Sequence, residues 1–257
     1  KGTTRAPRFG NPTPRIAEYA GGLLNAVGLQ NPGVDAFIAH ELPFLRNFDV
    51  KVIANISGNT PEEYGIMCEK LAGAGVDMIE VNISCPNTMA GEPFNQSPEA
   101  LDKLFTELDK IERPQPTLVK MPLNKSWEEF KDLLDVLAEH NVQGLSIANL
   151  QKDRAGMEIP RDWEGGLSGS PCYEASNERI KQVYREYGDR FAIAGIGGVF
   201  TPQQAYAKIR SGSSLVMFIS SLMYRGPQQI TVLKRGLAEL LKRDGFDHVS
   251  QAVGIDA

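Results

Sequence analysis

Amide and ammonium side chains stand where several apolar runs of the sequence end. An asparagine lies near the end of such a run, or shortly after it, at Asn25, Asn55, Asn82, Asn87 and Asn149, and a lysine does so at Lys120. The asparagine side chain offers paired donors and acceptors, which suits a planar, imide-like ring. A single asparagine at such a place often serves only a turn. Five of them together with a lysine indicate a binding site for a polar ring.

Lys120 and Cys85 each allow two interpretations. Lys120 ends an apolar run, and a lysine buried there needs an anionic or electron-rich partner. A flavin with negative charge developing at its N1–C2=O edge is such a partner, but snorkelling or a carboxylate would also explain the lysine. Cys85 stands in a loop between a serine and a proline, where its thiol could act as a base. A lone cysteine is more often a small buried apolar residue, and Cys68 and Cys172 fit that description.

Three glycine- or serine-rich stretches could hold a phosphate. Gly195-Ile196-Gly197-Gly198 ends an apolar run and precedes a helix capped by Thr201, and Ser220-Ser221 ends the last such run. The third stretch, residues 165–169, reads as a glycine-rich loop. Glycine lets backbone N–H groups approach a phosphate closely.

These residues are positioned by a regular alternation of apolar runs and amphipathic helices. The runs predict buried strands at residues 50–56, 78–83, 117–121, 144–148, 191–196 and 214–219. The periodic patterns and caps predict helices at residues 61–74, 98–112, from 126 onward, 177–187, from 202 onward and 227–243. The helix after Ser126 would bury Trp127, Phe130, Leu133, Leu134 and Leu137, and the last helix would bury Ile230, Leu233, Leu237, Leu240 and Leu241.

Strict alternation of strand and helix predicts a parallel sheet of the α/β class. A closed (β/α)8 barrel needs eight units, the chain shows six, and residues 1–49 are too irregular to supply two more. We therefore expect a single barrel domain over residues 1–257, with the first two βα units upstream of Lys1. An open doubly wound sheet is the rival, disfavoured because no GxGxxG follows the first strand.

Composition excludes several other classes of protein. The net charge is -5, which argues against a protein that binds the phosphate backbone of a nucleic acid. The three cysteines form no CxxC, so neither a zinc site nor a disulfide framework is indicated. No apolar run approaches the roughly 18 residues of a membrane span. We expect a cytoplasmic protein, with peripheral membrane association left open.

The sequence resembles the dihydroorotate dehydrogenase family over essentially its whole length. The most specific stretches are residues 8–15 (RFGNPTPR), 24–29 (LNAVGL), 81–87 (VNISCPN), 165–169 (GGLSG) and 195–198 (GIGG). The resemblance implies an FMN-dependent (β/α)8 barrel that oxidises dihydroorotate to orotate in the de novo synthesis of pyrimidines. In this family the substrate loses its C5 proton to a base and its C6 hydride to flavin N5. Soluble members use cysteine as the base, so Cys85 is the implied catalytic residue.

The resemblance also implies roles for the other polar residues. The substrate would be bound by Lys1, Asn25, Asn82, Asn87 and Asn149. The cofactor would be bound by Lys1, Asn55, Asn82, Lys120, Ser168, Gly169, Gly197, Gly198 and Ser220. Residues 88–96 would close over the substrate and exclude water.

Some residues depart from the family pattern. Leu150 stands where a serine or threonine is usual, which removes one hydroxyl contact to orotate, and residues 223–254 look more like the quinone-dependent members. The electron acceptor therefore stays open between quinone, fumarate and NAD through a partner subunit, and a homodimer is another possible assembly.

Two alternative functions also remain. One is another FMN barrel that acts on a dihydropyrimidine or dihydrouridine, and the other is a non-catalytic relative of the barrel enzymes.

Overall fold

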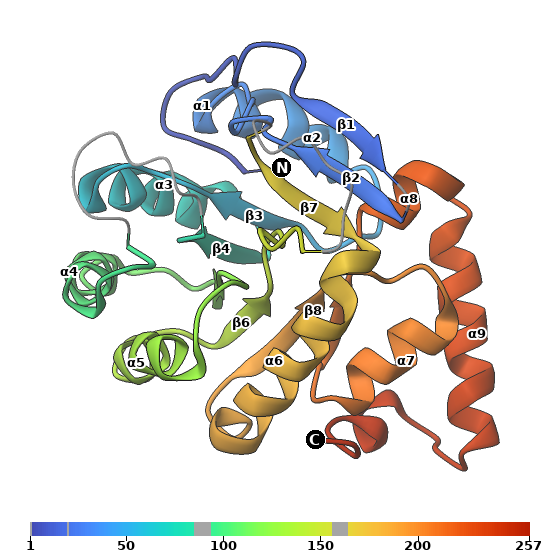
Figure 1. The fold of residues 1–257 in the computed structure, drawn as a ribbon. Helices are drawn as coiled ribbons and strands as arrows, with labels where there is room; N and C mark the ends of the chain where they lie inside the picture. Colours follow the sequence, from blue (N-terminus) through green and yellow to red (C-terminus); the bar gives the residue numbers. More distant parts are fainter. Residues whose placement is uncertain (1, 20, 85–93, 156–163) are drawn as a thin grey trace. The chain divides into compact units, whose positions relative to one another are not determined.

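The structure is a computed structural model that describes residues 2–19, 21–84, 94–155 and 164–257 (Figure 1). The chain falls into two compact units. Unit 1 comprises Lys1–Pro12, Val27–Met121 and Lys125–Gln143, and unit 2 comprises Thr13–Ala26, Pro122–Asn124 and Gly144–Ala257.

Unit 1 is built on three parallel strands with a helix after each. Its elements are α1 (Val34–Ala36), η1 (Phe37–Glu41), α2 (Leu42–Leu45), β3 (Ile53–Ile56), α3 (Pro61–Ala74), β4 (Met78–Asn82), α4 (Pro98–Asp109), β5 (Thr117–Lys120) and α5 (Trp127–Ala138). The strands pair in the order β3-β4-β5. Helix α4 packs between α3 and α5 along one side of these strands (Figure 1).

The helices of unit 1 begin and end where the sequence signals predict. Helix α3 starts at Pro61 behind a Thr60 cap and ends at Gly75, which takes the left-handed conformation at φ 82°. Helix α5 has the predicted capping box, in which Ser126 and Glu129 bond each other's backbone. Four residues of its predicted stripe are buried, and Trp127 is half-buried.

Unit 2 contains a parallel sheet and an antiparallel sheet. Its elements are β1 (Ile16–Tyr19), β2 (Gly22–Asn25), β6 (Gly144–Ile147), β7 (Gly166–Gly169), η2 (Ser170–Cys172), α6 (Tyr173–Tyr187), β8 (Ala192–Ile196), α7 (Pro202–Arg210), β9 (Leu215–Met217), α8 (Ser220–Arg225), α9 (Gln229–Arg243) and η3 (Val249–Ala252). Strands β6, β8 and β9 are parallel, whereas β1, β2 and β7 are antiparallel. Helix α7 packs against α9 (Figure 1).

The antiparallel sheet corrects two expectations. Residues 166–169 are a strand rather than a loop, and glycines on both paired strands let the two backbones approach: a Cβ on Gly169 would lie 2.8 Å from Gly22 Cα, and one on Gly22 would lie 1.9 Å from the Ser168 carbonyl oxygen. Asn25 ends a strand of this antiparallel sheet, so its position is not equivalent to those of the asparagines on parallel strands. Neither described strand within residues 1–49 is parallel to its partner, as expected.

Other boundaries differ because local packing overrides the pattern. The first predicted strand starts at Ile53 instead of Val50, since Val50 is exposed in the preceding loop. Helix α6 starts at Tyr173, four residues early, and α4 ends at Asp109 instead of residue 112. Ile230 is 48% exposed and does not join the buried stripe of α9. Ser220 begins helix α8 rather than ending a strand.

The parallel strands account for the six βα units that the sequence predicts. Strands β4 and β5 have buried apolar residues along their length and end on the polar residues Asn82 and Lys120. In the part of the chain that the structure describes, no helix combines the length and the apolar character that crossing a membrane requires.

Candidate active site

In unit 1, the carboxyl ends of three neighbouring strands bring predicted site residues together. Asn82 ends β4 and is aligned with Lys120, which ends β5, while Asn55 lies on β3. The Asn82 side-chain amide donates to Asn55 Oδ1 at 3.5 Å. Asn82 is 7% exposed, so its polar atoms need partners inside the protein or in a ligand.

A buried glutamate fixes the orientation of these two amides. Glu80 is 4% exposed, and its carboxylate accepts a hydrogen bond from the Asn55 side-chain amide. Asn55 thus turns its NH2 to Glu80 and its oxygen to Asn82. Asn82 Oδ1 then accepts from the backbone N–H and the hydroxyl of Ser84, at 3.2 and 2.6 Å. The result is one polarised chain of hydrogen bonds.

The sequence reasoning missed Glu80. The available signal was an acidic residue inside the apolar run from Met78 to Ile83. Side chains two apart on a strand share a face, so Glu80 lies on the same face of β4 as Asn82. A carboxylate so placed needs a donor, and the amide of Asn55, aligned with Glu80 in the register of β3 and β4, supplies one.

Tyr64 of α3 anchors the backbone at the same strand end. Its ring is 1% exposed, and its hydroxyl donates to the Asn82 carbonyl oxygen at 2.8 Å. We expect Tyr64→Phe to lower the free energy of unfolding by about 1 to 2 kcal/mol, because a buried carbonyl loses its donor while the ring still fills the space. Urea denaturation followed by circular dichroism measures this change. An unaltered midpoint would show that the bond contributes nothing net.

Lys120 is half-buried at the end of β5, as predicted. Its neighbours along the strand, Leu118 and Val119, are buried, so the ammonium lies at the polar end of an apolar strand. Three further predicted residues, Lys1, Cys85 and Asn87, and most of the predicted closing segment lie outside the described residues.

Unit 2 carries the remaining predicted residues. Asn25 ends β2, and Asn149 follows β6 by two residues. Leu150, the departure from the family pattern, packs against β7: a Cβ on Gly166 would lie 2.5 Å from the Leu150 Cβ. Leu150 therefore fills space against a glycine.

The glycine turn after β8, one of the predicted phosphate elements, packs on the start of α6. Gly197 and Gly198 follow β8 with φ of 117° and 69°, conformations that favour glycine. A Cβ on Gly197 would lie 2.9 Å from Cys172 Cβ, and one on Gly198 would lie 2.5 Å from Tyr173 Cβ, so this turn rests on the segment that follows β7. Within the described chain, neither glycine N–H donates to another residue. Two free amides in a glycine turn fit the oxygens of a phosphate.

The two predicted serines occupy different settings. Ser168 lies on β7 and its hydroxyl donates to the Leu23 carbonyl oxygen at 3.2 Å, so donation to a phosphate requires that hydroxyl to rotate. Tyr19 donates to the Ser168 carbonyl oxygen at 3.0 Å, and burial raises the pKa of its hydroxyl. Ser220 is buried at the start of α8, and Gly169 takes φ 99° at the end of β7.

The two described cysteines are buried, as the sequence indicated. Burial raises the pKa of the Cys68 thiol to about 11, so it stays protonated at neutral pH. Burial also raises the pKa of Cys172, whose thiol donates to the Leu167 carbonyl oxygen at 3.2 Å. Neither is suited to act as a base.

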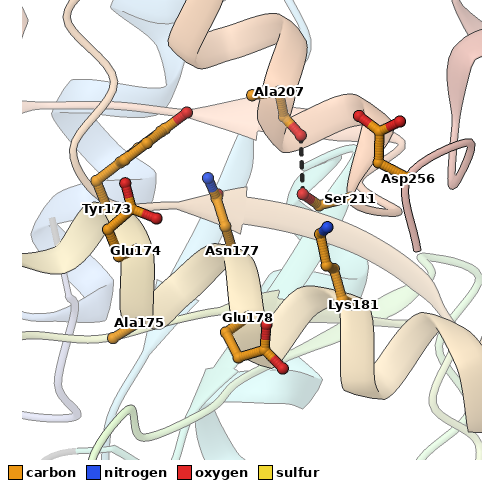
Figure 2. Close-up of a pocket in the computed structure, with 9 residues that line it drawn as sticks. All are labelled: Tyr173, Glu174, Ala175, Asn177, Glu178, Lys181, Ala207, Ser211 and Asp256. Atoms are coloured by element: carbon orange, nitrogen blue, oxygen red, sulfur yellow. Dashed lines mark hydrogen bonds between the residues drawn. The ribbon is translucent and has the colours of Figure 1, made fainter.

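A groove of about 550 Å³ lies elsewhere in unit 2, between α6 and α7 (Figure 2). Tyr173, Asn177, Lys181 and Ser211 are among its lining residues, and none of the predicted site residues lines it. It is therefore distinct from the strand ends described above.

Parallel strands with an amide and a lysine at neighbouring carboxyl ends, and a glycine turn with free amides after a later strand, are typical of α/β-barrel enzymes that bind a phosphate-bearing cofactor. Comparison with known proteins is more specific. The pattern of the family described as dihydroorotate dehydrogenase matches residues 1–241. The chain belongs to the dihydroorotate dehydrogenase family, whose members depend on FMN.

Named relatives and a solved structure agree with this assignment. The chain is 33% identical over 263 residues to "Dihydroorotate dehydrogenase B (NAD(+)), catalytic subunit" of Alkaliphilus oremlandii, covering 99% of this chain and 84% of the relative. It is 35% identical over 261 residues to the protein of the same name from Geobacillus kaustophilus, covering 99% and 82%. The crystal structure of ligand-free DHODH from Eimeria tenella matches 99% of this chain and 80% of that one with a TM-score of 0.88 at 24% identity, which shows the fold.

Proposed function

We propose that this chain oxidises dihydroorotate to orotate with FMN, in de novo pyrimidine synthesis, as a single barrel domain over residues 1–257. The observation that carries the proposal is the polarised chain from Glu80 through Asn55 to Asn82, next to Lys120 at the same strand ends. It presents oriented amides and one cation, which suit a planar imide ring with a carboxylate. The relatives named as dihydroorotate dehydrogenase support the choice of substrate.

In this proposal Cys85 removes the C5 proton of dihydroorotate. FMN, when bound, supplies the acceptor for the C6 hydride at its N5. A free thiol has a pKa of about 8.5, nearer to the operating pH than a serine hydroxyl, so a cysteine can take the proton without a relay. No histidine stands near Cys85 in the sequence, so any adjustment of the thiol pKa would come from the cofactor and backbone dipoles.

The binding roles follow from the family resemblance. Lys1, Asn25, Asn82, Asn87 and Asn149 would bind the substrate ring and its carboxylate. Asn55, Asn82, Lys120 and Lys1 would bind the flavin ring. Ser168, Gly169, Gly197, Gly198 and Ser220 would bind the phosphate. The free amides of Gly197 and Gly198 support the last assignment.

We further propose that electrons leave to NAD through a partner subunit. The relatives cited above are named as catalytic subunits of an NAD(+)-dependent enzyme, which supports a separate electron-transfer subunit. Activity that appears only when NAD and an added electron-transfer subunit are both present would support this. Turnover with fumarate or a quinone alone would contradict it.

An anaerobic flavin spectrum tests the proposed reaction. We expect the purified protein to carry oxidised FMN, and we expect dihydroorotate to bleach its visible band because the hydride reduces the ring. Bound flavin that stays oxidised with dihydroorotate but bleaches with another dihydropyrimidine or with a dihydrouridine would reassign the substrate. Protein without flavin would favour a non-catalytic relative.

A further inference from the structure

Lys208 of α7 is a fully buried cation without a carboxylate partner in the described part of the chain. Its side chain is completely enclosed, at 0% exposure. Its ammonium donates to Ser176 Oγ at 2.8 Å and to Asn177 Oδ1 at 2.7 Å, and it lies 5.6 Å from the centre of the Tyr173 ring. These partners are all neutral. A buried charge is normally paired with an opposite charge, so this lysine lacks an anion.

The side chain of Lys208 runs directly beneath the glycine turn after β8. A Cβ on Gly195 would lie 2.6 Å from both Cγ and Cδ of Lys208, so the aliphatic stem packs on that strand. Ser176, which accepts from the ammonium, would lie 3.1 Å from a Cβ on Gly197. One side chain thus contacts both the ammonium and the turn. The Ser176 side chain therefore lies between the Lys208 ammonium and Gly197.

The groove between α6 and α7 is a poor binding site for an anion that would pair with Lys208. Asn177 lines this groove (Figure 2). Its Oδ1 already accepts a hydrogen bond from the Lys208 ammonium. Glu174 and Glu178 also line it and are exposed, with Lys181 as the opposing cation. An anion in the groove would meet these carboxylates, whereas an anion on the glycine turn would meet free amides.

We propose that Lys208 is the buried countercharge of the FMN phosphate and acts on it through Ser176 and the Gly197–Gly198 turn. This inference rests on the proposed FMN-dependent function. Lys208 is a positioning residue, since it touches neither the substrate nor the flavin ring. A dianionic phosphate at the turn would restore charge balance to the lysine, and the lysine would hold the phosphate in return.

The pKa of Lys208 makes the affinity for a phosphate depend on pH, and this dependence can be measured. Burial lowers the pKa of the Lys208 ammonium to about 7, while Cys172 and Glu174 oppose that shift. Among the described residues, Tyr173 of α6 also faces the ammonium. A bound phosphate would favour the charged lysine, so phosphate affinity should be highest below pH 7 and fall as the pH rises and the lysine of the free protein loses its proton.

The first experiment compares FMN with riboflavin, which has the same ring and no phosphate. The protein freed of flavin is titrated with each, and flavin fluorescence gives the ratio of the riboflavin Kd to the FMN Kd. We expect Lys208→Met to reduce this ratio by about tenfold to a hundredfold, the size of one partly screened charge interaction. Riboflavin affinity should not change, and Lys208→Arg should restore part of the ratio.

A purely structural lysine gives a different result. Lys208→Met would then weaken both flavins equally or neither, and that outcome overturns the inference while the proposed function stands. A wild-type protein that binds neither flavin overturns the proposed function as well. Saturating FMN should restore dihydroorotate-dependent bleaching to Lys208→Met, because the substitution leaves the ring site intact.

The second experiment needs no variant and covers the case in which Lys208→Met does not fold. The same ratio is measured in the wild-type protein between pH 7 and pH 9, where the FMN phosphate stays a dianion. We expect the ratio to fall by about fivefold, the change that follows when the lysine pKa is about 7 in the free protein and one higher in the bound state. A flat ratio across this range would contradict the proposal.

Discussion

Cys85→Ala is expected to abolish dihydroorotate oxidation almost completely while the protein keeps its FMN. Proton removal by a positioned side chain contributes about a hundredfold to ten-thousandfold in rate, and alanine has no group that can take the proton. Stopped-flow bleaching of the flavin by dihydroorotate measures the loss directly. Retained FMN absorbance in the variant separates a lost base from a lost fold.

Cys85→Ser is the matched control for that experiment. A serine hydroxyl has a much higher pKa than a thiol, so the variant should retain a small activity that grows as the pH is raised. The wild-type rate should level off near the thiol pKa, which in free cysteine is about 8.5. Unchanged turnover in Cys85→Ala would eliminate Cys85 as the base.

Gly198→Ala is expected to cost about 3 kcal/mol of unfolding free energy and to weaken FMN binding. The backbone at Gly198 has φ 69°, and an added Cβ would lie 2.5 Å from Tyr173 Cβ and 2.9 Å from Tyr173 Cα. Those atoms belong to the first residue of α6 and cannot rotate away, so strain and overpacking add. Urea denaturation and FMN titration measure the two effects.

Gly73→Ala is the control for a glycine that tolerates a side chain. Gly73 lies in α3, and a Cβ there meets nothing within 4 Å. Alanine is the better helix former, so this variant should be more stable by about 0.5 to 1 kcal/mol. FMN affinity should be unchanged. Equal behaviour of the two variants would show that the turn after β8 tolerates a side chain.

The polar strand ends of unit 1 could be predicted because they depend on local pattern. The apolar runs place Asn82 and Lys120 at the ends of β4 and β5, and strand alternation requires those ends to share one edge. Their alignment in the register follows from the parallel pairing of β4 and β5. The roles of Cys85, Asn87 and Lys1 stay predictions from the family resemblance.

The place of β7 in the antiparallel sheet could not be predicted, because its partner β2 is distant in the sequence. Glycines at 165 and 169 look like a loop until β2 lies beside this stretch: a Cβ on Gly165 would lie 2.2 Å from the Asn25 carbonyl oxygen, and one on Gly169 would lie 2.8 Å from Gly22 Cα. The prediction that Ser220 ends a strand was also wrong, because β9 ends at Met217 and Ser220 is the first residue of α8. Pairing over such sequence distances leaves no periodic signal in the sequence.

The sequence by itself determined the βα alternation, the helix caps and the residue types at the strand ends, since each depends on neighbours a few positions apart. Tertiary structure decided which partners those residues take. Glu80 orients Asn55 because β3 and β4 pair in one register, and Lys208 lies near the glycine turn because α6 packs on β8 and α7 packs on α6. Burial removes the water that would otherwise solvate a charged side chain. Its partners must then come from residues that are distant in the sequence, and only the tertiary structure identifies them.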